Sequence, residues 1–455
     1  MLGRVAAVEV AQVDPHVGQA HAGRAEAAER LDGLDQLGRV PAVPAGLVAV
    51  DRPDQADLLV VTQGGFRQSA APGDLLDRAH TGQCRIVEAL EVKGRADMTQ
   101  DTYRLGVMDG DGIGPEIVPA AVRVVDAAAQ ELDIDWVPLP VGRSAIDEFG
   151  TPLPESTVEA LSGVDGWLLG PHDNASYPEP HRSRLNPSGF LRKHFDLFAN
   201  IRPARAFDGA RALVPGTDLV IVRENTQGFY ADRNTFAGAG EFMPTPDVAI
   251  AHAIFTRESV ERIAHEAFRL ARQRRRRVTV VHKANVLRLT SGLFLDVCRE
   301  VARQYPDVEV GDMHIDAMAA ALVRRAPEFD VIVTENMFGD ILSDLTAEIA
   351  GSLGIAPSVN VSAARGMAQA THGSAPDIAG RDVANPVAMI LSAAMLLEWL
   401  GERHDDPAPA RVAGIIREAV AETIRGGVTT PDLGGSAGTR AFTDAVVVSI
   451  KHMTG

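Results

Sequence analysis

The stretch YRLGVMDGDGIGPE, from Tyr103 to Glu116, decides the fold class of this chain. Its first six residues, Tyr103 to Met108, are mostly apolar and predict a strand. The glycines that follow allow a tight turn and a close approach of the backbone to a ligand, and Pro115 suits the first turn of a helix. The glycine spacing is not that of the Rossmann fingerprint. The stretch therefore predicts a strand, a glycine turn and a helix in an α/β protein.

Strand-like and helix-like segments alternate from Tyr103 onward, as in α/β proteins. We expect further strands at Gly166 to Leu169, Leu219 to Arg223, Val278 to His282 and Val331 to Thr334. Helices are expected at Glu116 to Gln130, Arg257 to Arg272, Gly292 to Gln304 and Pro386 to Leu400. No internal repeat or low-complexity linker follows Met98, so we expect one compact unit split by a cleft.

The first 97 residues differ in composition from the rest of the chain. Alanine, glycine, valine, arginine and aspartate dominate there, and no catalytic pattern is found. The pattern allows a helix at Arg24 to Leu34 and a strand at Asp57 to Thr62. Because Met98 stands just before the first well-formed strand, we expect residues 1–97 to be a dispensable extension or the product of a mis-assigned start codon.

The chain of 455 residues carries 44 basic and 61 acidic residues, for a net charge of −17. This charge disfavours nonspecific binding to nucleic acid or to an anionic membrane, so an anionic substrate needs a local basic cluster. The basic run Arg274 to Arg277 ends a helical stretch, where cations suit the helix dipole. The two cysteines, Cys84 and Cys298, exclude a disulfide framework and a zinc ligand set. With no apolar signal core and no membrane-length stretch, we expect a cytoplasmic protein.

Two aspartates four residues apart, Asp340 and Asp344, lie in the run TENMFGDILSD that begins at Thr334. On a helix, residues i and i+4 share a face, so both carboxylates can converge on one hard cation. The alternative is an ordinary amphipathic helix that Asp340 caps, with Asp344 as a solvated charge. The spacing alone leaves both interpretations open.

Three arginines on separate elements, Arg192, Arg202 and Arg223, are candidates for binding a dicarboxylate. Guanidinium groups bind carboxylates in a bidentate way, although single arginines are more often surface ion-pair partners. Lys283 follows the strand that ends at His282, where a nearby cation and arginines can lower its proton affinity enough for it to act as a base. Without that context, a lysine at a strand end is a solvated charge.

Several motifs, in the same order, resemble those of the isocitrate and isopropylmalate dehydrogenase family. The run from Gly110 to Glu116 is similar to the family's GDGIGPE opening, and NMFGDILSDLTAEIAGSLGI, from Asn336 to Ile355, is similar to its metal-site motif. The resemblance covers roughly Tyr103 to Gly401. It implies a two-domain fold with a large mixed sheet flanked by helices, and not a Rossmann fold. The implied units are a large cofactor-binding domain, 98–198 plus 351–455, and a small domain, 199–350, with the dimer interface and the metal and catalytic residues.

The resemblance also implies roles for the candidate residues. The three arginines would bind the carboxylate that leaves as carbon dioxide, and Tyr230 would give a proton to the resulting enol. Lys283 would assist deprotonation during hydride transfer, and Asp316 would be a third metal carboxylate beside Asp340 and Asp344. In the family, the equivalents of Lys283 and Asp316 come from the neighbouring subunit. We therefore expect a homodimer with shared active sites.

The loop HGSAPDIAG, which begins at His372, is implied to hold the adenosine end of the dinucleotide. Its cofactor-binding residues would be His372, Gly373, Ser374, Ala375, Asp377, Ile378 and Asn385. Asp377 can accept hydrogen bonds from ribose hydroxyls and would repel a 2′-phosphate, and Ile378 offers no cation to such a phosphate. NAD is therefore favoured over NADP.

Together these parts predict NAD-dependent oxidative decarboxylation of a 3-substituted malate with Mg²⁺ or Mn²⁺. The side-group pocket is expected before Arg192, where Asn186 and Ser188 are polar and Phe190 is apolar. This mixture leaves isopropylmalate, isocitrate, homoisocitrate and tartrate or D-malate open as substrates.

Two interpretations from other classes stand beside this one. The chain could be a non-catalytic regulatory subunit of an oligomeric dehydrogenase, but the retained Lys283, Tyr230 and three aspartates argue against that. It could be a nucleic-acid-binding module built around the Arg274 run. The net charge and the lack of interleaved aromatic residues disfavour this second alternative.

Overall fold

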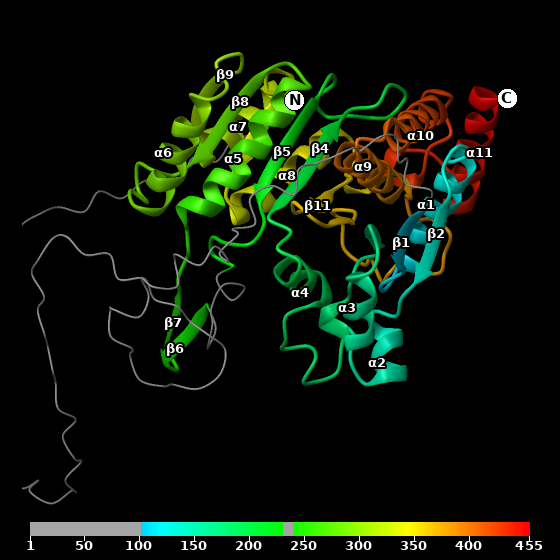
Figure 1. Ribbon diagram of the computed structural model, residues 1–455, viewed down its shortest axis with the longest axis horizontal. Helices are drawn as coiled ribbons and strands as arrows, with labels where there is room; N and C mark the ends of the chain where they lie inside the picture. The colour runs from blue at the N-terminus through cyan, green and yellow to red at the C-terminus, as the bar shows by residue number, and fades with distance from the viewer. Residues whose placement is uncertain (1–101, 231–239) are drawn as a thin grey trace, which may run out of the picture. The chain divides into compact units, whose positions relative to one another are not determined.

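The structure is a computed structural model that describes residues 102–230 and 240–455. In Figure 1, helices cover a long central sheet within this part of the chain. The extension expected at residues 1–97, with its helix at Arg24 to Leu34 and its strand at Asp57 to Thr62, lies outside the described residues. The first described element is β1, which begins at Tyr103.

A ten-stranded sheet runs through the described residues in the order β2-β1-β3-β12-β11-β4-β5-β10-β8-β9. All five strands expected from the sequence are present, as β1, β3, β5, β8 and β10. The strands are β1 (Tyr103–Met108), β2 (Ile134–Pro138), β3 (Gly166–Leu169), β4 (Ala199–Arg205), β5 (Asp218–Glu224), β8 (Arg277–His282), β9 (Glu309–His314), β10 (Val331–Thr334), β11 (Val359–Val361) and β12 (Gly366–Ala368).

Three antiparallel pairings at the centre of the sheet join two parallel sets of strands. β11 pairs antiparallel with β12 and β4, and β4 pairs antiparallel with β5. On one side lie β1, β2, β3, β11 and β12, and on the other lie β4, β5, β8, β9 and β10. This order agrees with domain boundaries near residues 198 and 350, and the division into domains stays a prediction.

The four expected helices are all found, and the last of them continues to His404 because Asp405 then turns the backbone into the left-handed region, with φ 54°. The longer helices are α1 (Gly114–Ala128), α5 (Arg257–Arg272), α6 (Thr290–Ala302), α7 (Ile315–Arg325), α8 (Asn336–Ala350), α9 (Val387–His404), α10 (Pro407–Arg425) and α11 (Thr439–Thr454). Shorter helices are α2 (Arg143–Phe149), α3 (Glu155–Leu161) and α4 (Pro187–His194).

Alternate residues of β5 face two different helix layers. Ile221 is buried in a cluster with Leu322 of α7 and Leu342 of α8. Val220 and Val222 belong instead to the large cluster that contains the apolar face of α5 and nearly all of α9. Successive strand side chains point to opposite faces of a sheet, so α7 and α8 cover one face and α5 the other.

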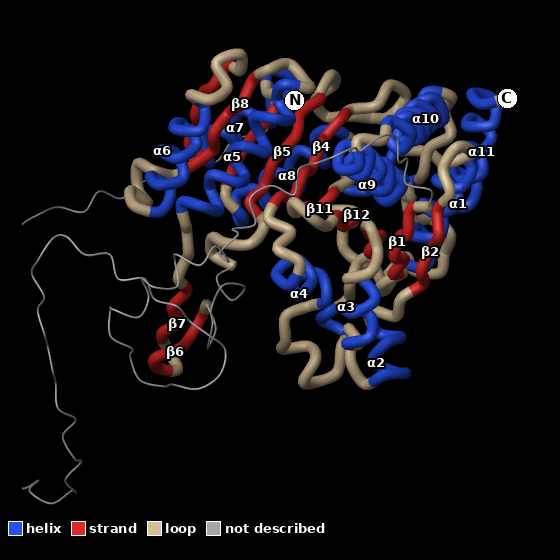
Figure 2. The backbone as a smooth tube through the Cα atoms, viewed as in Figure 1, coloured by secondary structure: helices blue, strands red, loops and turns tan. Residues whose placement is uncertain are grey.

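A small hairpin, β6 (Glu241–Thr245) with β7 (Val248–Ala251), stands apart from the ten strands. Figure 2 shows it extending away from the main sheet. All residues of both strands are exposed, including Phe242 at 50% and Met243 at 62%. The sequence did not predict this hairpin, because its strands bury no apolar face in this chain.

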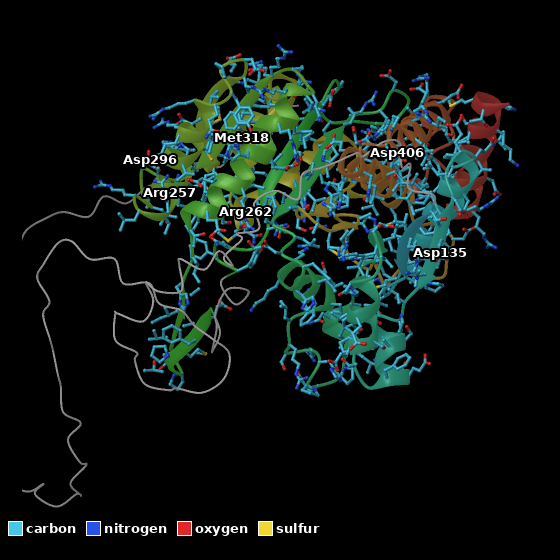
Figure 3. All side chains as sticks on the ribbon, viewed as in Figure 1. Asp135, Arg257, Arg262, Asp296, Met318 and Asp406 are labelled. Carbon is cyan, nitrogen blue, oxygen red and sulfur yellow. The ribbon has the colours of Figure 1, made fainter. Side chains whose placement is uncertain are left out.

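A buried hydrogen bond ties the first strand to the C-terminal helices. The hydroxyl of Tyr103 donates to Asp406 Oδ2 at 2.8 Å. Asp406, labelled in Figure 3, also caps α10 by accepting from the backbone N–H of Ala408 at 2.9 Å. Burial and the neighbouring carboxylate raise the pKa of Tyr103, so its hydroxyl stays a donor. In the described part of the chain, no helix combines the length and the apolarity needed to cross a membrane.

Candidate active site

Helix α8 begins at a buried cap, Glu335. The Glu335 carboxylate accepts hydrogen bonds from the backbone N–H groups of Met337 and Phe338 at 3.0 and 3.1 Å, which satisfies two amides of the first turn. Burial raises the pKa of Glu335 to about 7. The alternative in which Asp340 caps this helix is therefore wrong, and Asp340 lies in the second turn with its carboxylate directed to other side chains.

Three predicted site residues converge on Asp340. Arg202 Nη1 lies 3.1 Å from Asp340 Oδ1, and Arg223 Nη1 donates to the same oxygen. The hydroxyl of Tyr230 donates to Asp340 Oδ2 at 3.2 Å. Although burial raises the pKa of Asp340, the charges of Arg223 and Arg202 hold it below the ordinary value. A carboxylate, two guanidinium groups and a phenol thus share one small site.

Both arginines at Asp340 are held rigidly. The side chains of Arg202 and Arg223 are only 6% and 2% exposed. Burial and the charge of Arg223 lower the pKa of Arg202 to about 10, so it remains a cation at neutral pH. Side-chain oxygens from the neighbouring elements orient the guanidinium groups, namely Asn200 and Ser343 for Arg202 and Asn336 for Arg223.

Gly339 explains how Arg223 can lie so close to α8. A Cβ atom at position 339 would stand 2.6 Å from Arg223 Cγ and 2.8 Å from its Cβ. Real Cβ atoms do not approach other carbons so closely, and the side-chain base of Arg223 cannot move without moving β5. Glycine at this position therefore permits the contact between Arg223 and Asp340.

Asp344 lies one turn beyond Asp340 on the same helix face, as its spacing predicts. Its nearest cation is Arg202, whose Nη1 lies 4.0 Å from Asp344 Oδ1. Burial, and then the negative charge of Asp340, raise the pKa of Asp344. A bound divalent cation would offset this repulsion, and its preferred ligands are carboxylate oxygens. The pair of aspartates therefore fits a metal ion.

Arg192 approaches the site from α4. Its charge lowers the pKa of Asp340, after the larger effects of burial, Arg223 and Arg202. Arg192 Nη2 and the hydroxyl of Ser188 both donate to Gln369 Oε1, at 2.9 and 2.8 Å. Gln369 was not among the residues predicted for the site. The predicted substrate residue Asn186 caps α4, since its side chain accepts from Gly189 N at 2.7 Å.

Lys283 and Asp316 form a separate pair. Lys283 Nζ donates to Asp316 Oδ1 at 2.6 Å, and this hydrogen bond lowers the pKa of Asp316. The Asp316 side chain is 69% exposed. Within residues 102–230 and 240–455, no three His, Cys, Asp or Glu side chains lie close enough to hold one metal ion. One chain thus brings Asp340 and Asp344 together but not Asp316.

The glycine turn that opens α1 is organised by Asp111, which the sequence did not single out. Its carboxylate accepts from the backbone N–H groups of Arg143 and Asp173 at 2.7 and 2.9 Å, and from the hydroxyl of Tyr177 at 2.5 Å. Burial opposes ionisation, but the neighbouring His172 ring, together with these hydrogen bonds, lowers the pKa of Asp111 to about 2. Gly110 has φ 73°, a conformation that favours glycine.

The predicted cofactor loop packs against this turn. Ser374 O accepts from Ile113 N at 2.9 Å. Glu116, from the same GDGIGPE motif, accepts from the backbone N–H groups of Gly380 and Asp382 at 2.6 and 3.0 Å. The motif and the loop, more than 250 residues apart, are therefore one structural unit.

Within that loop the predicted residues differ in exposure. Asp377 and Gly373 are exposed, whereas Ser374 is buried and Ile378 packs against the large core cluster beside Ala375. Burial lowers the pKa of His372. The side chain of Asn385 is used within the fold, since its Nδ2 donates to Asp432 Oδ2 at 3.0 Å and its Oδ1 accepts from Val387 N at 3.0 Å.

Comparison with known proteins identifies the relationship that these features share. The family model for isocitrate/isopropylmalate dehydrogenase matches residues 104–446. The chain belongs to this family. An isocitrate/homoisocitrate dehydrogenase of Thermus thermophilus is 44% identical over 354 residues, which cover 77% of this chain and 99% of that protein. A 3-isopropylmalate dehydrogenase of Archaeoglobus fulgidus is 42% identical over 344 residues, covering 75% of this chain and 98% of that protein.

Among solved structures, isocitrate dehydrogenase from Methylococcus capsulatus matches with a TM-score of 0.69 and 39% identity, covering 77% of this chain and 99% of that one. Membership in the isocitrate/isopropylmalate dehydrogenase family makes this chain a β-decarboxylating dehydrogenase that acts on isocitrate- or isopropylmalate-type acids. Enzymes of this family use NAD or NADP and a divalent metal ion. The predicted family, enzyme class and mixed α/β fold are confirmed.

The basic run from Arg274 to Arg277 is part of the fold. Arg274 Nε donates to Asp330 Oδ1 and its Nη2 to Asp218 Oδ1, both at 2.8 Å. Arg277 Nε lies 3.2 Å from Glu309 Oε2. These arginines therefore join neighbouring strands of the sheet by ion pairs.

Proposed function

We propose that this dehydrogenase catalyses NAD-dependent oxidative decarboxylation of a 3-substituted malate with Mg²⁺ or Mn²⁺. The observation that carries the proposal is the convergence of Arg202, Arg223 and Tyr230 on Asp340. Two buried cations there can bind a substrate carboxylate, the carboxylate of α8 can bind the metal ion, and the phenol can supply a proton. The proposed reaction needs carboxylate binding, metal binding and proton supply around the same substrate molecule.

The metal ion would be held by Asp340 and Asp344, with Asp316 of a second copy as the third carboxylate. When bound, it supplies Lewis acidity that polarises the substrate oxygen atoms. Arg192, Arg202 and Arg223 would bind the carboxylate that leaves as carbon dioxide and fix its orientation. Their burial excludes water from that end of the substrate.

Tyr230 and Lys283 would move the protons. Lys283 would take the proton of the substrate hydroxyl group while the hydride goes to the dinucleotide. Tyr230 gives its phenolic proton to the carbon from which carbon dioxide has left. Its hydroxyl lies 3.2 Å from Asp340 and its ring 5.9 Å from the Arg223 guanidinium carbon, so it stands beside the bound carboxylate.

A homodimer would complete the site. Exposed apolar side chains occur near Lys283, on α7, on α8 and on the β6–β7 hairpin, namely Val286 (65%), Leu289 (88%), Val323 (51%), Ile341 (57%), Phe242 (50%) and Met243 (62%). Apolar surface of this kind is typical of subunit interfaces. A second copy covering it would bring another Lys283 and Asp316 toward Asp340 and Asp344.

NAD is the proposed dinucleotide, because the exposed Asp377 offers a carboxylate to ribose hydroxyls and Ile378 offers no cation to a 2′-phosphate. Replacing Asp377 with Lys and Ile378 with Tyr should raise the use of NADP relative to NAD. An unchanged cofactor preference in that double variant would show that the loop is misassigned. With only two cysteines in the chain, we place the reaction in the reducing cytoplasm.

The substrate side group would lie over α4, where Ser188 is buried and Phe190 is 40% exposed. Ser188 donates its hydroxyl proton to Gln369, so the pocket floor is polar while Phe190 adds apolar surface at its edge. A pocket with both polar and apolar surface can bind polar as well as branched apolar side groups. Isopropylmalate and isocitrate are the proposed substrates, with homoisocitrate and tartrate or D-malate as alternatives.

One experiment tests the function as a whole. NADH formation is followed across a panel of substituted malates with Mn²⁺ and then with an added chelator. We expect turnover of at least one 3-substituted malate, and its loss when the metal ion is removed. Activity that survives complete chelation would refute the proposed mechanism, and the ranking of the panel identifies the side group.

A further inference from the structure

Gln369 contacts two of the residues that the sequence placed at the substrate. Its Oε1 accepts from Ser188 Oγ at 2.8 Å and from Arg192 Nη2 at 2.9 Å. Gln369 directly follows β12, and 7% of its surface is exposed. It therefore connects an end of the central sheet to α4, the helix that carries both partners.

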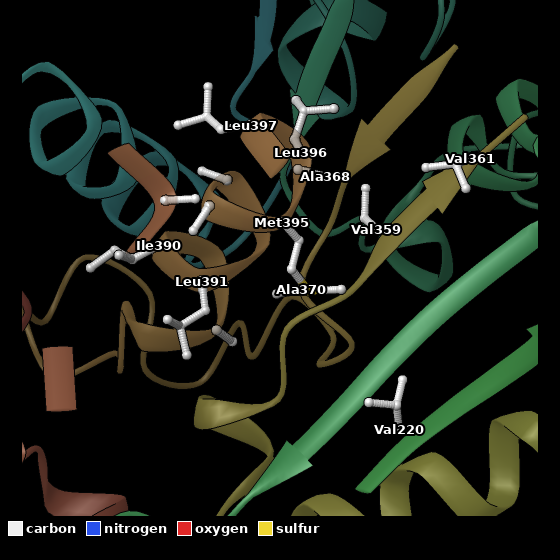
Figure 4. Packing of buried hydrophobic residues seen from close by; sticks show 14 of the residues in the cluster. Val220, Val359, Val361, Ala368, Ala370, Ile390, Leu391, Met395, Leu396 and Leu397 are labelled. Atoms are coloured by element: carbon white, nitrogen blue, oxygen red, sulfur yellow. The ribbon is translucent and has the colours of Figure 1, made fainter. Parts of the chain in front are cut away.

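The backbone of Gln369 is fixed on both sides. Its neighbours Ala368 and Ala370 are buried in the large core cluster (Figure 4). Its N–H donates to Ser358 O at 3.1 Å, and its carbonyl accepts from the Ser358 hydroxyl at 2.5 Å. Ser358 N donates in turn to Ser392 Oγ of α9 at 3.0 Å. The side-chain amide of Gln369 is thus held in place before any ligand binds, which favours specific recognition.

The orientation of this amide follows from the chemistry of its partners. A guanidinium group carries only donors, so the atom that faces Arg192 must be the amide oxygen. The Ser188 hydroxyl contacts the same oxygen and gives its proton to it. In the described part of the chain, Gln369 Nε2 makes no hydrogen bond. Both of its protons can therefore be donated to a ligand.

The other polar groups of α4 are already used within the protein. Asn186 Oδ1 accepts from Gly189 N at 2.7 Å, and the hydroxyl proton of Ser188 goes to Gln369. The donor that this cluster offers to a ligand is therefore Gln369 Nε2, next to the charge of Arg192.

Phe190, the apolar residue expected at this pocket, lies on another face of α4. Ser188 and Arg192 are four residues apart and share one helix face, whereas Phe190 lies about 200° around the helix from Ser188. Its ring stacks on His194, with 5.5 Å between the ring centres. Phe190 can therefore contribute to the edge of the pocket but not to its floor, which is polar.

The charge of Arg192 is not cancelled by its contact with Gln369, because the amide is neutral. A carboxylate at the same place would form an ion pair with Arg192. The same charge acts on Asp340, whose pKa it lowers after the larger effects of burial, Arg223 and Arg202. Arg192 therefore links the pocket at Gln369 to the cluster around Asp340.

We propose that Gln369 is a specificity-determining residue that selects a substrate side group ending in a carboxylate. Its Nε2 donates to that carboxylate, and the charge of Arg192 balances the added negative charge. An isopropyl group would leave the amide protons without an acceptor, which costs binding free energy. This inference rests on the proposed function and narrows its substrates to tricarboxylic acids of the isocitrate type.

Binding without turnover is measured by isothermal titration calorimetry on the full chain with Mg²⁺ and no dinucleotide. Titrations into buffer correct for chelation of Mg²⁺ by each acid. We expect isocitrate to bind at least about tenfold more tightly than 3-isopropylmalate. Equal binding, tighter binding of 3-isopropylmalate, or binding of neither acid would overturn the proposal. The expected preference without any NADH formation would count against the proposed function alone.

The Gln369→Glu variant separates recognition from structural support. Glutamate keeps an oxygen that accepts from Ser188 and Arg192, but it replaces the donating Nε2 with a second acceptor oxygen. We expect the preference for isocitrate to fall at least about tenfold, because the new charge repels a carboxylate side group. If Gln369 only supports its two partners, the preference stays unchanged. Gln130→Glu, the same change in the exposed turn after α1, is the matched control and should keep it.

Kinetics then assign the amide to the substrate or to the dinucleotide. In Gln369→Glu, kcat/KM for isocitrate relative to 3-isopropylmalate should fall at least about tenfold, while the KM for NAD changes less than about twofold. A raised KM for NAD with an unchanged substrate ratio would place the amide at the dinucleotide and overturn the proposal. Thermal unfolding confirms that each variant is folded, and the comparison in the unmodified protein needs no variant.

Discussion

Asp340 and Asp316, two of the three proposed metal ligands, lie in opposite surroundings. Asp340 is 39% exposed and is contacted by two buried arginines and a tyrosine. Asp316 is 69% exposed, and Lys283 is the partner that its side chain contacts. Within one chain, Asp340 belongs to a cluster of four side chains, whereas Asp316 belongs to a single ion pair.

This contrast marks the part of the proposed site that one chain supplies. A buried cluster of charges is stable only when its members are paired within the fold, and the Asp340 cluster satisfies this condition. An exposed ion pair contributes little to stability, so the Lys283–Asp316 pair has no evident structural purpose in one chain. We interpret it as the half of the site that a second copy uses.

The largest expected effect comes from removing the negative charge of Asp340. Asp340→Asn should lower kcat by at least about a hundredfold, because a metal carboxylate and the partner of two arginines are lost together. NADH formation in saturating Mn²⁺ measures this. Asp135→Asn, which removes an exposed ion pair with Arg104, is the matched control and should turn over normally. Near-normal turnover of Asp340→Asn would remove that residue from the site.

A second test asks whether the two regions meet across subunits. Lys283→Met and Asp340→Asn should each be nearly inactive, and refolding them together should restore about a quarter of normal activity, because half of the random dimers carry one intact site. Each variant refolded alone is the control. If mixing restores no activity, Lys283 and Asp340 act within one chain. The Lys283–Asp316 pair is then not the half of the site that a second copy uses.

A smaller effect concerns pH and the buried cap of α8. The folded-state pKa of Glu335, about 7, lies above its ordinary value of 4.5, so the folded state holds a proton that the unfolded state releases between these values. The contribution of Glu335 to stability is full below pH 4.5 and is lost as the pH rises through 7. As the pH rises from 5.5 to 8.5, the free energy of unfolding should therefore fall by about 2 kcal/mol less in Glu335→Gln than in the unmodified protein.

Urea unfolding at the two pH values measures this difference, with Glu328→Gln at an exposed ion pair as the control. The two backbone N–H groups bond to different oxygens of Glu335, so the glutamine, which keeps one acceptor oxygen, can still accept from one of them. An identical pH dependence in Glu335→Gln and in the unmodified protein would show that Glu335 is ionised throughout this range.

The smallest expected effect is the change in thermal stability when the Lys283–Asp316 ion pair is removed. Lys283→Ala should change Tm by less than about 2 °C, because an exposed ion pair contributes little to stability. The same variant should lose nearly all turnover. Differential scanning calorimetry on dilute protein gives the first quantity. A large fall in Tm would mean that Lys283 has a structural role that its exposure does not reveal.

Local sequence patterns predicted five strands, four helices and the shared helix face of Asp340 and Asp344 for physical reasons. Asp340 and Asp344 lie on one helix, so their spacing alone places them on one face. Arg223 ends a strand that the sequence predicted, whereas Arg202 lies in the middle of β4, which the sequence did not predict. Both arginines were identified through the resemblance to the family's motifs. Helix α8 itself was considered only through the spacing of Asp340 and Asp344, and its cap proved to be Glu335.

Other parts of the site could not be predicted from the amino-acid sequence alone. Gln369 joins Ser188 and Arg192 across 181 and 177 residues of sequence, and no local pattern marks such a contact. Asp111 looked like one more turn residue until the fold placed Tyr177 on its carboxylate. The order of the ten strands, with its antiparallel centre, likewise depends on packing of distant segments rather than on local propensity.

Gly339 sets a limit on how this enzyme can vary. In a library of random substitutions at α8, position 339 should accept glycine alone, because a single methyl group would occupy the space of the Arg223 side chain. Position 341, two residues later, carries an isoleucine that is 57% exposed and has no such restriction in one chain. The number of residue types tolerated along this helix should therefore rise from one to many within half a turn. Measured position by position, this number would mark the edge of the site without any bound ligand.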